Sequence, residues 1–540
     1  MNALAVVHSR ALLGLSAPSV SVEVHLANGL PAFNIVGLPE TSVRESRERV
    51  RAALLQSGLD FPNRRITVNL APADLPKESG RFDLPIAIGI AAAAGALPIE
   101  ALRDIELVGE LSLSGELRPI RAALAVASGI RAHAPGRGLI LPLANLPEAR
   151  PSELGSLHGA ATLAEVIRYL RGEGQLTSAH DLPEAHPAPE ASEDSLPDLS
   201  DVMGQLVARR ALEISAAGMH PLLMSGSPGT GKSMLAQRLP GLLPPLSHTD
   251  ALESATIHAA SGQTGSLRTT PAYRAPHHSI TAAALMGGGS PPRPGEISLA
   301  HAGVLFLDEL PEFRRHVIEC LREPLETGHV TLSRGVFSET FPARFLLVAA
   351  MNPCPCGSLG DPARQCRCTP AQIRRYQAKL SGPLLERFDL GIEMVREPSL
   401  TPSRTQQDAC ATAGTRPESS VVVAQRVLEA RHRQTGRQGC CNAHLPVSRF
   451  DECLHVAPEA TLLLRQAAEH FGWSLRSQHK TLRVARTIAD LAGSTIISPN
   501  HLAEAVALRR PLDHLASDHA NDGMMAWQDA SSTKETRHAV

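Results

Sequence analysis

Three things are scarce in this sequence: aromatic residues, net charge and long apolar runs. Phe, Trp and Tyr make up 3 % of its 540 residues, which argues against a platform of aromatic rings for stacking nucleic-acid bases. The 52 basic and 54 acidic residues nearly cancel, so any contact with nucleic acid must come from local patches. The longest apolar run, about residues 86–97, is too short to span a bilayer, and no secretory signal begins the chain. We therefore expect a cytoplasmic protein without membrane contact.

The length and the cysteine content set further limits. A chain of 540 residues is long enough for about three domains, each with a sizeable core. Nine cysteines without a secretory signal predict a reducing compartment, in which they are free thiols or metal ligands.

The central feature is a stretch that fits the pattern of a phosphate-binding loop, G-x-x-x-x-G-K-[ST]. Residues 222–224 before it predict a buried strand, and residues 234–239 after it predict the first turns of a helix. This context places backbone N–H groups and a helix N-terminus around a polyphosphate. Lys232 would reach the β- and γ-phosphates of ATP, and Ser233 would hold Mg²⁺. The stretch comprises Gly226, Ser227, Pro228, Gly229, Thr230, Gly231, Lys232 and Ser233.

Two further apolar runs end in polar residues that suit the same chemistry. Residues 304–307 predict a strand buried on both faces, as in a parallel sheet, and Asp308 and Glu309 follow it. Asp308 would hold the Mg²⁺ shell, and Glu309 would orient water for attack on the γ-phosphate. Residues 345–350 predict a second buried strand, and the amide of Asn352 just beyond it could position the same water. This asparagine precedes a proline, so a plain turn residue is the alternative.

An arginine further along the chain suits a catalytic role between subunits. Arg387 lies in the stretch Leu-Leu-Glu-Arg-Phe-Asp, beyond the strand that ends near Asn352. It could act as a finger that reaches the γ-phosphate of a neighbouring subunit. The alternative is an ion pair within the chain, with Glu386 or Asp389.

Residues 1–172 predict an α+β domain. The alternation of apolar residues over 20–26 predicts a half-buried strand, and Asn28-Gly29 predicts a tight hairpin to a partner strand at 33–36. Helices are expected at 40–56 and 84–94.

Two stretches of this domain, residues 76–80 and 109–120, resemble the proteolytic domain of Lon proteases, which has the ribosomal S5 domain 2-like fold. A Lon-type site needs a serine nucleophile and a lysine base. The two matching positions carry Arg81 and Leu124, and Ser79 lies two residues from the nucleophile position. The resemblance therefore implies an inactive relative of a protease, used for assembly or partner contact.

The rest of the chain divides by composition. Residues 173–200 are acidic and proline-rich, so they predict a linker that cannot bury a core. Residues 201–395 hold the phosphate-binding pattern and predict a P-loop α/β domain. A connector at 396–419 leads to a helical region at 420–512, in which Arg476 could contact the γ-phosphate in cis. Residues 513–540 are polar and predict a disordered tail.

Four cysteines within 354–368 form two C-x-C pairs separated by nine residues. Four thiolates can close a tetrahedral Zn²⁺ site, although this spacing is tighter than the usual C-x-x-C. Reduced structural cysteines are the alternative. A basic run follows, because residues 361–387 contain six Lys or Arg against two acids. It suits contact with a phosphate backbone, or it is a solvated face. The cysteines are Cys354, Cys356, Cys366 and Cys368.

Two inserts rich in glycine and proline interrupt the P-loop domain, at 286–297 and 328–341. Each places a basic residue at an expected loop tip, Arg293 in the first and Arg334 in the second. Ordinary surface loops are the alternative. The pair His277-His278 lacks the spacing of a shared ligand face, so we interpret it as structural.

Several motifs together resemble the Mg-chelatase-like AAA+ ATPases of the YifB/ComM type, over residues 1 to about 512. The resemblance implies that residues 226–233 are Walker A, that Asp308 and Glu309 are Walker B, and that Asn352 is sensor 1. It implies that Arg387 is the arginine finger and that Arg476 is sensor 2. The motifs are Arg274-Ala-Pro-His-His-Ser-Ile, Gly287-Gly-Gly-Ser-Pro-Pro-Arg-Pro-Gly-Glu-Ile, Phe306-Leu-Asp-Glu-Leu-Pro-Glu-Phe, Met351-Asn-Pro-Cys-Pro-Cys-Gly, Leu380-Ser-Gly-Pro-Leu-Leu-Glu-Arg-Phe-Asp and Val484-Ala-Arg-Thr-Ile-Ala-Asp-Leu.

The same resemblance implies an α/β multidomain fold with a central AAA+ domain and a C-terminal helical lid. It also implies a homo-hexamer, ATP and Mg²⁺ as cofactors, and inserts that face a central pore. The chain departs from the family pattern at Glu386, where Asp is usual, and at Lys480, where Arg is usual.

Two functions remain open at this point. The first is an ATPase that translocates DNA as a branch-migration helicase in natural transformation, where it could meet recombination proteins. The second is a chelatase-type motor that remodels a protein partner without DNA. The basic run, the arginine-tipped inserts and the lack of an acidic integrin-like domain favour the first.

Overall fold

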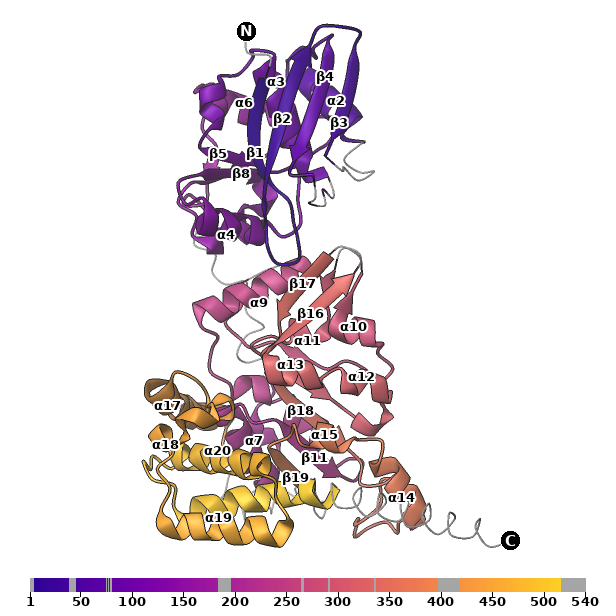
Figure 1. Ribbon diagram of the computed structural model, residues 1–540, viewed down its shortest axis with the longest axis vertical. Coiled ribbons are helices and arrows are strands. Elements are labelled where there is room, and N and C mark those ends of the chain that lie inside the picture. Colours follow the sequence, from indigo (N-terminus) through magenta and orange to yellow (C-terminus); the bar gives the residue numbers. More distant parts are fainter. Residues whose placement is uncertain are drawn as a thin grey trace, which may run out of the picture.

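The computed structural model describes residues 4–37, 45–73, 75, 77, 80–182, 196–263, 267–289, 292–334, 337–396 and 417–515. In Figure 1 the N-terminal sheet lies at the top, the P-loop domain in the middle and the C-terminal helices at the lower left. The predicted fold class is confirmed: an α+β domain, a central domain with a parallel sheet, and a helical region.

The N-terminal domain is built on a sheet whose strand order is β10-β9-β8-β5-β1-β2-β4-β3. The helix α3 (Asp83–Ala93) packs on this sheet, and all of its residues are buried because nearly all are apolar. The strands are β1 (Leu4–Arg10), β2 (Ser19–Ala27), β3 (Ala32–Val36), β4 (Arg65–Ala71), β5 (Ile105–Leu107), β8 (Gly138–Pro142), β9 (Leu157–Ala160) and β10 (Thr177–Ser178). The other main helices are α2 (Ser46–Gln56), α4 (Ala123–His133) and α6 (Leu163–Leu170).

The hairpin predicted at Asn28-Gly29 is wrong. The chain does turn there, but β2 pairs antiparallel with β1 and β4, and β3 pairs parallel with β4. Strand β4 therefore lies between the two expected partners. A local turn signal gives the reversal of the chain, whereas the long-range pairing decides which strands become neighbours.

The two positions that match the Lon catalytic pair carry side chains without that chemistry. Arg81 is buried and its Nη2 donates to the carbonyl of Arg121 at 3.4 Å. Leu124 lies in α4 and is fully buried in the apolar interior. Ser79 lies outside the described residues.

The P-loop domain has a five-stranded sheet with the order β12-β15-β18-β11-β19, and all of its pairings are parallel. Its central strands are apolar throughout and buried on both faces, as the sequence predicts for parallel strands. The strands are β11 (Leu222–Gly226), β12 (Tyr273–Arg274), β15 (Val304–Leu307), β18 (Leu346–Met351) and β19 (Leu390–Met394). Helices around the sheet include α7 (Leu206–Gly218), α8 (Lys232–Ala236), α9 (His248–Ala260), α10 (Ala282–Met286), α13 (Arg322–Thr327) and α14 (Pro370–Gln377).

Both inserts of this domain are hairpins, and they lie against each other. The first pairs β13 (Gly287–Gly288) with β14 (Arg293–Pro294), and the second pairs β16 (His329–Arg334) with β17 (Phe337–Pro342). Strand β13 contacts β16.

Helices α17 and α20 pack on α7, and the C-terminal helices share one apolar core with the central sheet. The helices are α17 (Ser420–Gln438), α18 (Phe450–Cys453), α19 (Pro458–Phe471) and α20 (Leu475–Leu491), followed by helical residues 499–515. Residues 513–515, which the sequence placed in the tail, continue this helix, and residues 516–540 lie outside the described residues. Asp513 is held there by a hydrogen bond from the Trp473 indole N–H at 2.7 Å.

Candidate nucleotide-binding and catalytic site

The phosphate loop, residues 226–233, joins β11 to α8 at the C-terminal edge of the central sheet. Gly229 and Gly231 have φ angles of 80° and 92°, in the left-handed region where glycine is favoured. A Cβ on Gly226 would lie 2.6 Å from the carbonyl oxygen of Met394, so the close approach of β19 also requires glycine. A Cβ on Gly229 would meet nothing within 4 Å, so the outer turn of the loop is open to a ligand.

The candidate Mg²⁺ ligands meet across the site. Ser233 Oγ donates a hydrogen bond to Asp308 Oδ2 at 2.5 Å, and the backbone N–H of Glu309 donates to Asp308 Oδ1 at 2.9 Å. A hydroxyl and a carboxylate at this distance are oxygen ligands of the type Mg²⁺ prefers, and both can reach one ion. The residues therefore fit the ATP and Mg²⁺ that the loop pattern predicts.

Lys232 and Asn352 meet beside the loop. Lys232 Nζ donates to the carbonyl oxygens of Gly226 at 2.5 Å and Ser227 at 3.1 Å, and to Asn352 Oδ1 at 3.2 Å. Burial lowers the pKa of Lys232, while the negative charges of the neighbouring carboxylates act in the opposite direction. The predicted phosphate-binding lysine and the predicted amide thus lie on one side of the site.

Glu309 contacts a histidine that the sequence analysis interpreted as structural. His278 Nδ1 lies 3.4 Å from Glu309 Oε2. The His278 ring also lies 4.0 Å from the ring of His277 and packs edge-on against Phe313. His278 is therefore part of the site. The sequence did not predict this contact, because His278 lies about 30 residues before Glu309, which follows β15.

Arg387 lies at the other edge of the sheet. It precedes β19, whose Leu390 pairs with Leu222 at the start of β11, whereas Met394 pairs with Gly226 at the phosphate loop. Four residues of a parallel strand span about 13 Å. Arg387 therefore lies well away from the phosphate loop of its own chain.

Arg476 lies with Arg387, and the two arginines share one carboxylate. Arg387 Nη2 lies 2.6 Å from Glu326 Oε1, and Arg476 Nη2 lies 2.8 Å from the same oxygen. The ion-pair partner of Arg387 is therefore Glu326, and not Glu386 or Asp389, the two acids proposed as alternatives. Arg387 and Arg476 line a cavity of about 770 Å³ between the sheet and the C-terminal helices.

Arg476, which was expected to contact the γ-phosphate in cis, lies beside Arg387 and not beside the phosphate loop of its own chain. Helix α20, which carries Arg476, packs against α7 rather than over the phosphate loop. The arginine therefore lies at the edge of the sheet opposite to the loop. Its acidic partner comes from α13, which the sequence pattern did not connect to it.

A buried polar network ties α20 to the segment that carries Arg387. Lys480 Nζ donates to Asp389 Oδ1 at 2.6 Å and to the carbonyl oxygen of Arg387 at 3.0 Å. His220 Nδ1 lies 2.8 Å from Asp389 Oδ2. Burial alone would raise the pKa of Asp389, but the charge of Lys480 and the hydrogen bond with His220 outweigh it and hold the pKa below its ordinary value. The unusual Lys480 is therefore a structural partner of the arginine segment.

The four cysteines of 354–368 converge as a zinc ligand set requires. The Sγ of Cys354 lies 3.4 Å from that of Cys356 and 3.7 Å from that of Cys366, and the last two lie 3.6 Å apart. All four sulfurs, with Cys368, lie within 4.8 Å of one another. Zn–S bonds of about 2.3 Å in a tetrahedron place sulfurs about 3.8 Å apart. Hydrogen bonds from the backbone of Arg367 and Ser358 to the Cys356 sulfur lower the pKa of Cys356 to about 5.

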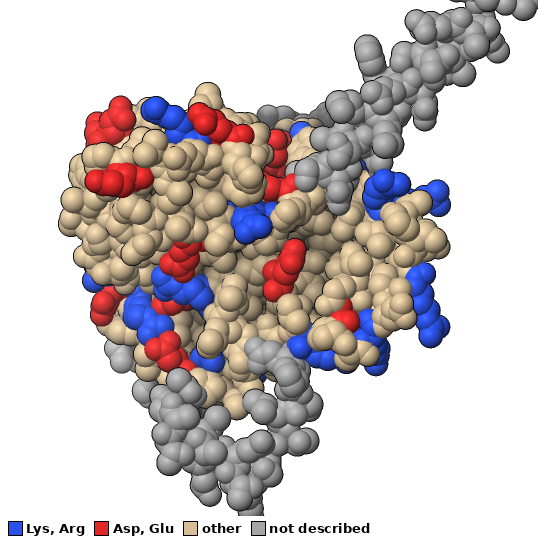
Figure 2. All heavy atoms as spheres, turned by 90° about the horizontal axis from the view of Figure 1, so that it is seen from below, with Lys and Arg blue, Asp and Glu red and all other residues tan. Residues whose placement is uncertain are grey.

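Basic side chains are exposed at two places. Around α14 the exposed residues are Arg364, Arg367, Arg374, Arg375 and Lys379. Figure 2 shows Lys and Arg gathered at the right-hand edge, on the side where Figure 1 places α14. Arg293 on β14 is exposed at the paired hairpins, whereas the side chain of Arg334 lies outside the described part.

Three family descriptions match successive parts of the chain: "Magnesium chelatase, subunit ChlI" at residues 198–401, "Subunit ChlI of Mg-chelatase" at 22–145, and "Magnesium chelatase, subunit ChlI C-terminal" at 417–509. The YifB protein of Escherichia coli K12 is 46 % identical over 523 residues, which cover 95 % of this chain and 99 % of YifB. The competence protein ComM of Haemophilus influenzae is 45 % identical over 508 residues, which cover 94 % and 97 % of the two chains. The chain belongs to the YifB/ComM family of Mg-chelatase-like AAA+ proteins.

This member of the YifB/ComM family is more distantly similar to magnesium chelatase itself. The 38 kDa magnesium-chelatase subunit of Rhodobacter capsulatus is 24 % identical over 356 residues, which cover 59 % of this chain and 90 % of that subunit. Within the described ranges, every helix is too short or too polar to span a lipid bilayer.

Proposed function

We propose that this protein is an ATPase whose subunits form a ring, in which ATP bound by one subunit is hydrolysed with the help of its neighbour, to drive DNA translocation as a branch-migration helicase. The observation that carries the proposal is the position of Arg387 and Arg476. Both lie at the edge of the sheet opposite to the phosphate loop and share Glu326, so in our proposal a second subunit would complete the site.

The residues of one chain would supply most of the chemistry. The phosphate loop and Lys232 would bind the phosphates of ATP, and Ser233 and Asp308 would hold Mg²⁺, which neutralises charge on the phosphates. Glu309 would orient and polarise the attacking water, and the amide of Asn352 would help to position the same water. The neighbour's Arg387 would stabilise the charge that develops on the γ-phosphate as its bond breaks.

The ring follows from the way the subunits would meet. The contact would join the loop edge of one sheet to the arginine edge of the next, so it would be heterologous, and such a contact forms a ring when the rotation between neighbours closes. A homo-hexamer is the assembly that we propose. In each interface, Arg387 and Arg476 would exchange the carboxylate of Glu326 for the neighbour's phosphate oxygens.

The hairpins support DNA as the partner. The inserts at 286–297 and 328–341 are neighbours, so in a ring they would form one set of loops around a central channel. Arg293 is exposed there, and Arg334 belongs to the second hairpin. Arginines at these positions would grip phosphates without reading the base sequence. The name of the H. influenzae relative, a competence protein, agrees with a role in the uptake of DNA.

A second function is favoured by one observation. The similarity to the magnesium-chelatase subunit of R. capsulatus covers most of that subunit, so the same motor could act on a protein partner without DNA. The site described above serves both functions equally, because it concerns ATP alone.

The deciding experiment measures ATP hydrolysis with and without branched DNA. We expect DNA to stimulate turnover in the wild type, and the stimulation to fall steeply with salt because phosphate contacts release counterions. The double variant Arg293→Ala with Arg334→Ala should lose stimulation and strand displacement. The control is Arg64→Ala with Arg103→Ala, which removes two exposed arginines of the N-terminal domain. A wild-type ATPase that ignores DNA would favour the protein-remodelling function, and normal unwinding by the hairpin variant would reject the channel mechanism.

We also propose that the four cysteines bind one structural Zn²⁺. The support is the sulfur geometry, which approaches the separation that tetrahedral Zn–S bonds require. Elemental analysis of the purified chain should find about one zinc per chain. A content below about 0.2 would reject the site.

A further inference from the structure

The cysteine insert, which we call the knuckle (residues 352–369), lies directly against the phosphate loop. A Cβ on Gly357 would lie 2.6 Å from Cδ and 2.8 Å from Cγ of Pro228. Gly357 has a φ of 74° and is buried, so its backbone fits against the Pro228 ring where no side chain would. The knuckle thus forms a wall of the loop that would bind the phosphates.

Two more contacts join the same partners. Arg396 Nη2 donates to the carbonyl oxygen of Pro228 at 3.0 Å, and its Nε lies 3.8 Å from Oδ2 of Asp361 in the knuckle. The side chain of Asp361 is 1 % exposed, so its carboxylate is shielded from water, whereas the side chain of Arg396 is 34 % exposed. The arginine therefore bridges the loop and the knuckle from the end of β19.

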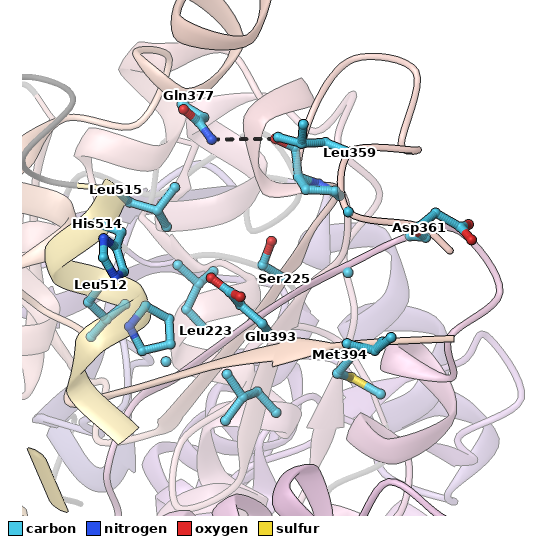
Figure 3. Close-up of a pocket in the computed structure, with 18 of the residues that line it drawn as sticks. Leu223, Ser225, Leu359, Asp361, Gln377, Glu393, Met394, Leu512, His514 and Leu515 are labelled. Carbon is cyan, nitrogen blue, oxygen red and sulfur yellow. Dashed lines mark hydrogen bonds between the residues drawn. The ribbon is translucent and has the colours of Figure 1, made fainter. Parts of the chain in front are cut away.

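Helix α14, which directly follows the knuckle, holds the segment that carries Asn352. Gln377 of α14 donates to the carbonyl oxygen of Pro353 at 3.4 Å, between Asn352 and the first cysteine. Figure 3 shows this bond beside a cavity of about 250 Å³, which Ser227 and Asp361 help to line. Loop and knuckle are thus two walls of one cavity, and Asn352 lies at their junction.

The knuckle has no apolar core of its own. Among residues 352–369, all of which are described, only Cys354 and Gly357 are buried. So little burial cannot offset the entropy of ordering an irregular segment of this length. A cross-link must hold its shape, and the four converging sulfurs are the groups that can supply one.

We propose that zinc in the knuckle controls nucleotide binding: the metal holds Gly357 against Pro228 and Asn352 beside Lys232, so loss of zinc weakens the binding of ATP. The zinc would be a support and not a catalyst, because it would be closed by four cysteines and would have no open position for water. This inference rests on the proposed nucleotide and zinc sites, and it is independent of DNA.

The first test uses two glycines of the knuckle that share a left-handed φ angle. Gly357 and Gly360 have φ angles of 74° and 75°, so alanine strains the backbone equally at both. A Cβ at Gly360 meets nothing within 4 Å, whereas at Gly357 it strikes Pro228. Binding of a fluorescent ATP analogue is measured without DNA in full-length protein. We expect Gly357→Ala to keep its zinc and to weaken binding at least fivefold relative to Gly360→Ala. Equal affinities in the two variants would show that the contact between Gly357 and Pro228 does not support nucleotide binding.

The second test removes the metal. Cys366→Ser should lose zinc and weaken the binding of the same analogue, whereas Cys320→Ser changes a cysteine outside the cluster and should leave both unchanged. A zinc-free Cys366→Ser protein that binds the analogue as the wild type does would overturn the control by zinc. A wild type without zinc would reject the metal site itself. If Cys366→Ser does not fold, removal of zinc from the wild type with a zinc-selective chelator gives the same comparison.

Discussion

The guanidinium of Arg387 lies 2.6 Å from the carboxylate of Glu326, at the edge of the sheet opposite to the phosphate loop. Arg387 is 8 % exposed and was expected to pair, if at all, with an acid next to it in sequence. Its partner instead comes from α13, and the same carboxylate holds Arg476 from α20. The two arginines are thus brought to one point by elements of the P-loop domain and the C-terminal helices.

This relationship predicts that two inactive variants restore each other's activity. Lys232→Ala removes the phosphate-binding lysine, and Arg387→Ala removes the arginine, so each alone should lack ATPase activity. In mixed rings, an intact loop will meet an intact arginine at about one interface in four when subunits assort at random. We expect the mixture to hydrolyse ATP measurably, as followed by phosphate release. Failure of mixed, assembled rings to recover activity would place Arg387 in cis. The same mixture with Arg476→Ala tests the second arginine.

A second prediction separates binding from turnover within one subunit. Lys232→Ala should weaken the binding of ATP. Among the described residues, Lys232 carries the only ammonium group at the phosphate loop. Glu309→Gln should retain binding and slow turnover by about 10²- to 10⁴-fold, because it removes a general base alone. Equilibrium binding and steady-state hydrolysis distinguish the two variants. Normal turnover in Glu309→Gln would refute its assignment to the attacking water.

The parts of the site that sequence alone predicts are those encoded by local patterns. The glycine-rich loop, the buried strands before Asp308 and Asn352, and the paired cysteines each lie within one short stretch. Residues far apart in sequence form the contacts that sequence did not predict: Glu326 lies 150 residues from Arg476. Strand pairing at β2 and β3 was missed for the same reason, since β4 inserts between them from a later part of the chain.

A third prediction concerns the histidine that contacts Glu309. His278→Ala removes a group 3.4 Å from the Glu309 carboxylate, so the carboxylate loses its orientation toward water. We expect kcat to fall about tenfold with KM for ATP unchanged, as for loss of a positioning contact. His277→Ala is the matched control, because this ring lies tilted against His278 and its Nδ1 bonds to Ser279 instead of Glu309. His278→Gln should restore part of the activity through its amide. Equal kcat in His278→Ala and wild type would show that the contact has no role in turnover.

The fourth prediction is that the N-terminal domain has no peptidase activity. The positions that match a serine–lysine pair carry a buried arginine, Arg81, and a buried leucine, Leu124, and neither can act as nucleophile or base. Purified protein incubated with casein and ATP should leave the casein intact on a gel. Degradation by the wild type that disappears in Ser79→Ala would contradict this.

The last prediction concerns the buried pair that joins the C-terminal helices to the arginine segment. Asp389→Asn leaves the ammonium of Lys480 buried without its counter-charge, and such losses cost about 3–5 kcal/mol. We expect a lower thermal unfolding midpoint and, because Lys480 also bonds to the Arg387 carbonyl, a lower ATPase activity. Asp60→Asn, at an exposed position, should unfold as the wild type does.

The pH dependence of this pair has a defined sign. The pKa of Asp389 is lower in the folded chain than the ordinary value near 3.9, so between these two values the unfolded chain binds more protons. The stabilisation by the pair is therefore fully present above about pH 4 and is lost as the pH falls further. The difference in unfolding midpoint between wild type and Asp389→Asn should shrink below pH 4, as measured by calorimetry from pH 7 to pH 3. A difference that stays constant over this range would show that the charge of Asp389 does not stabilise the fold.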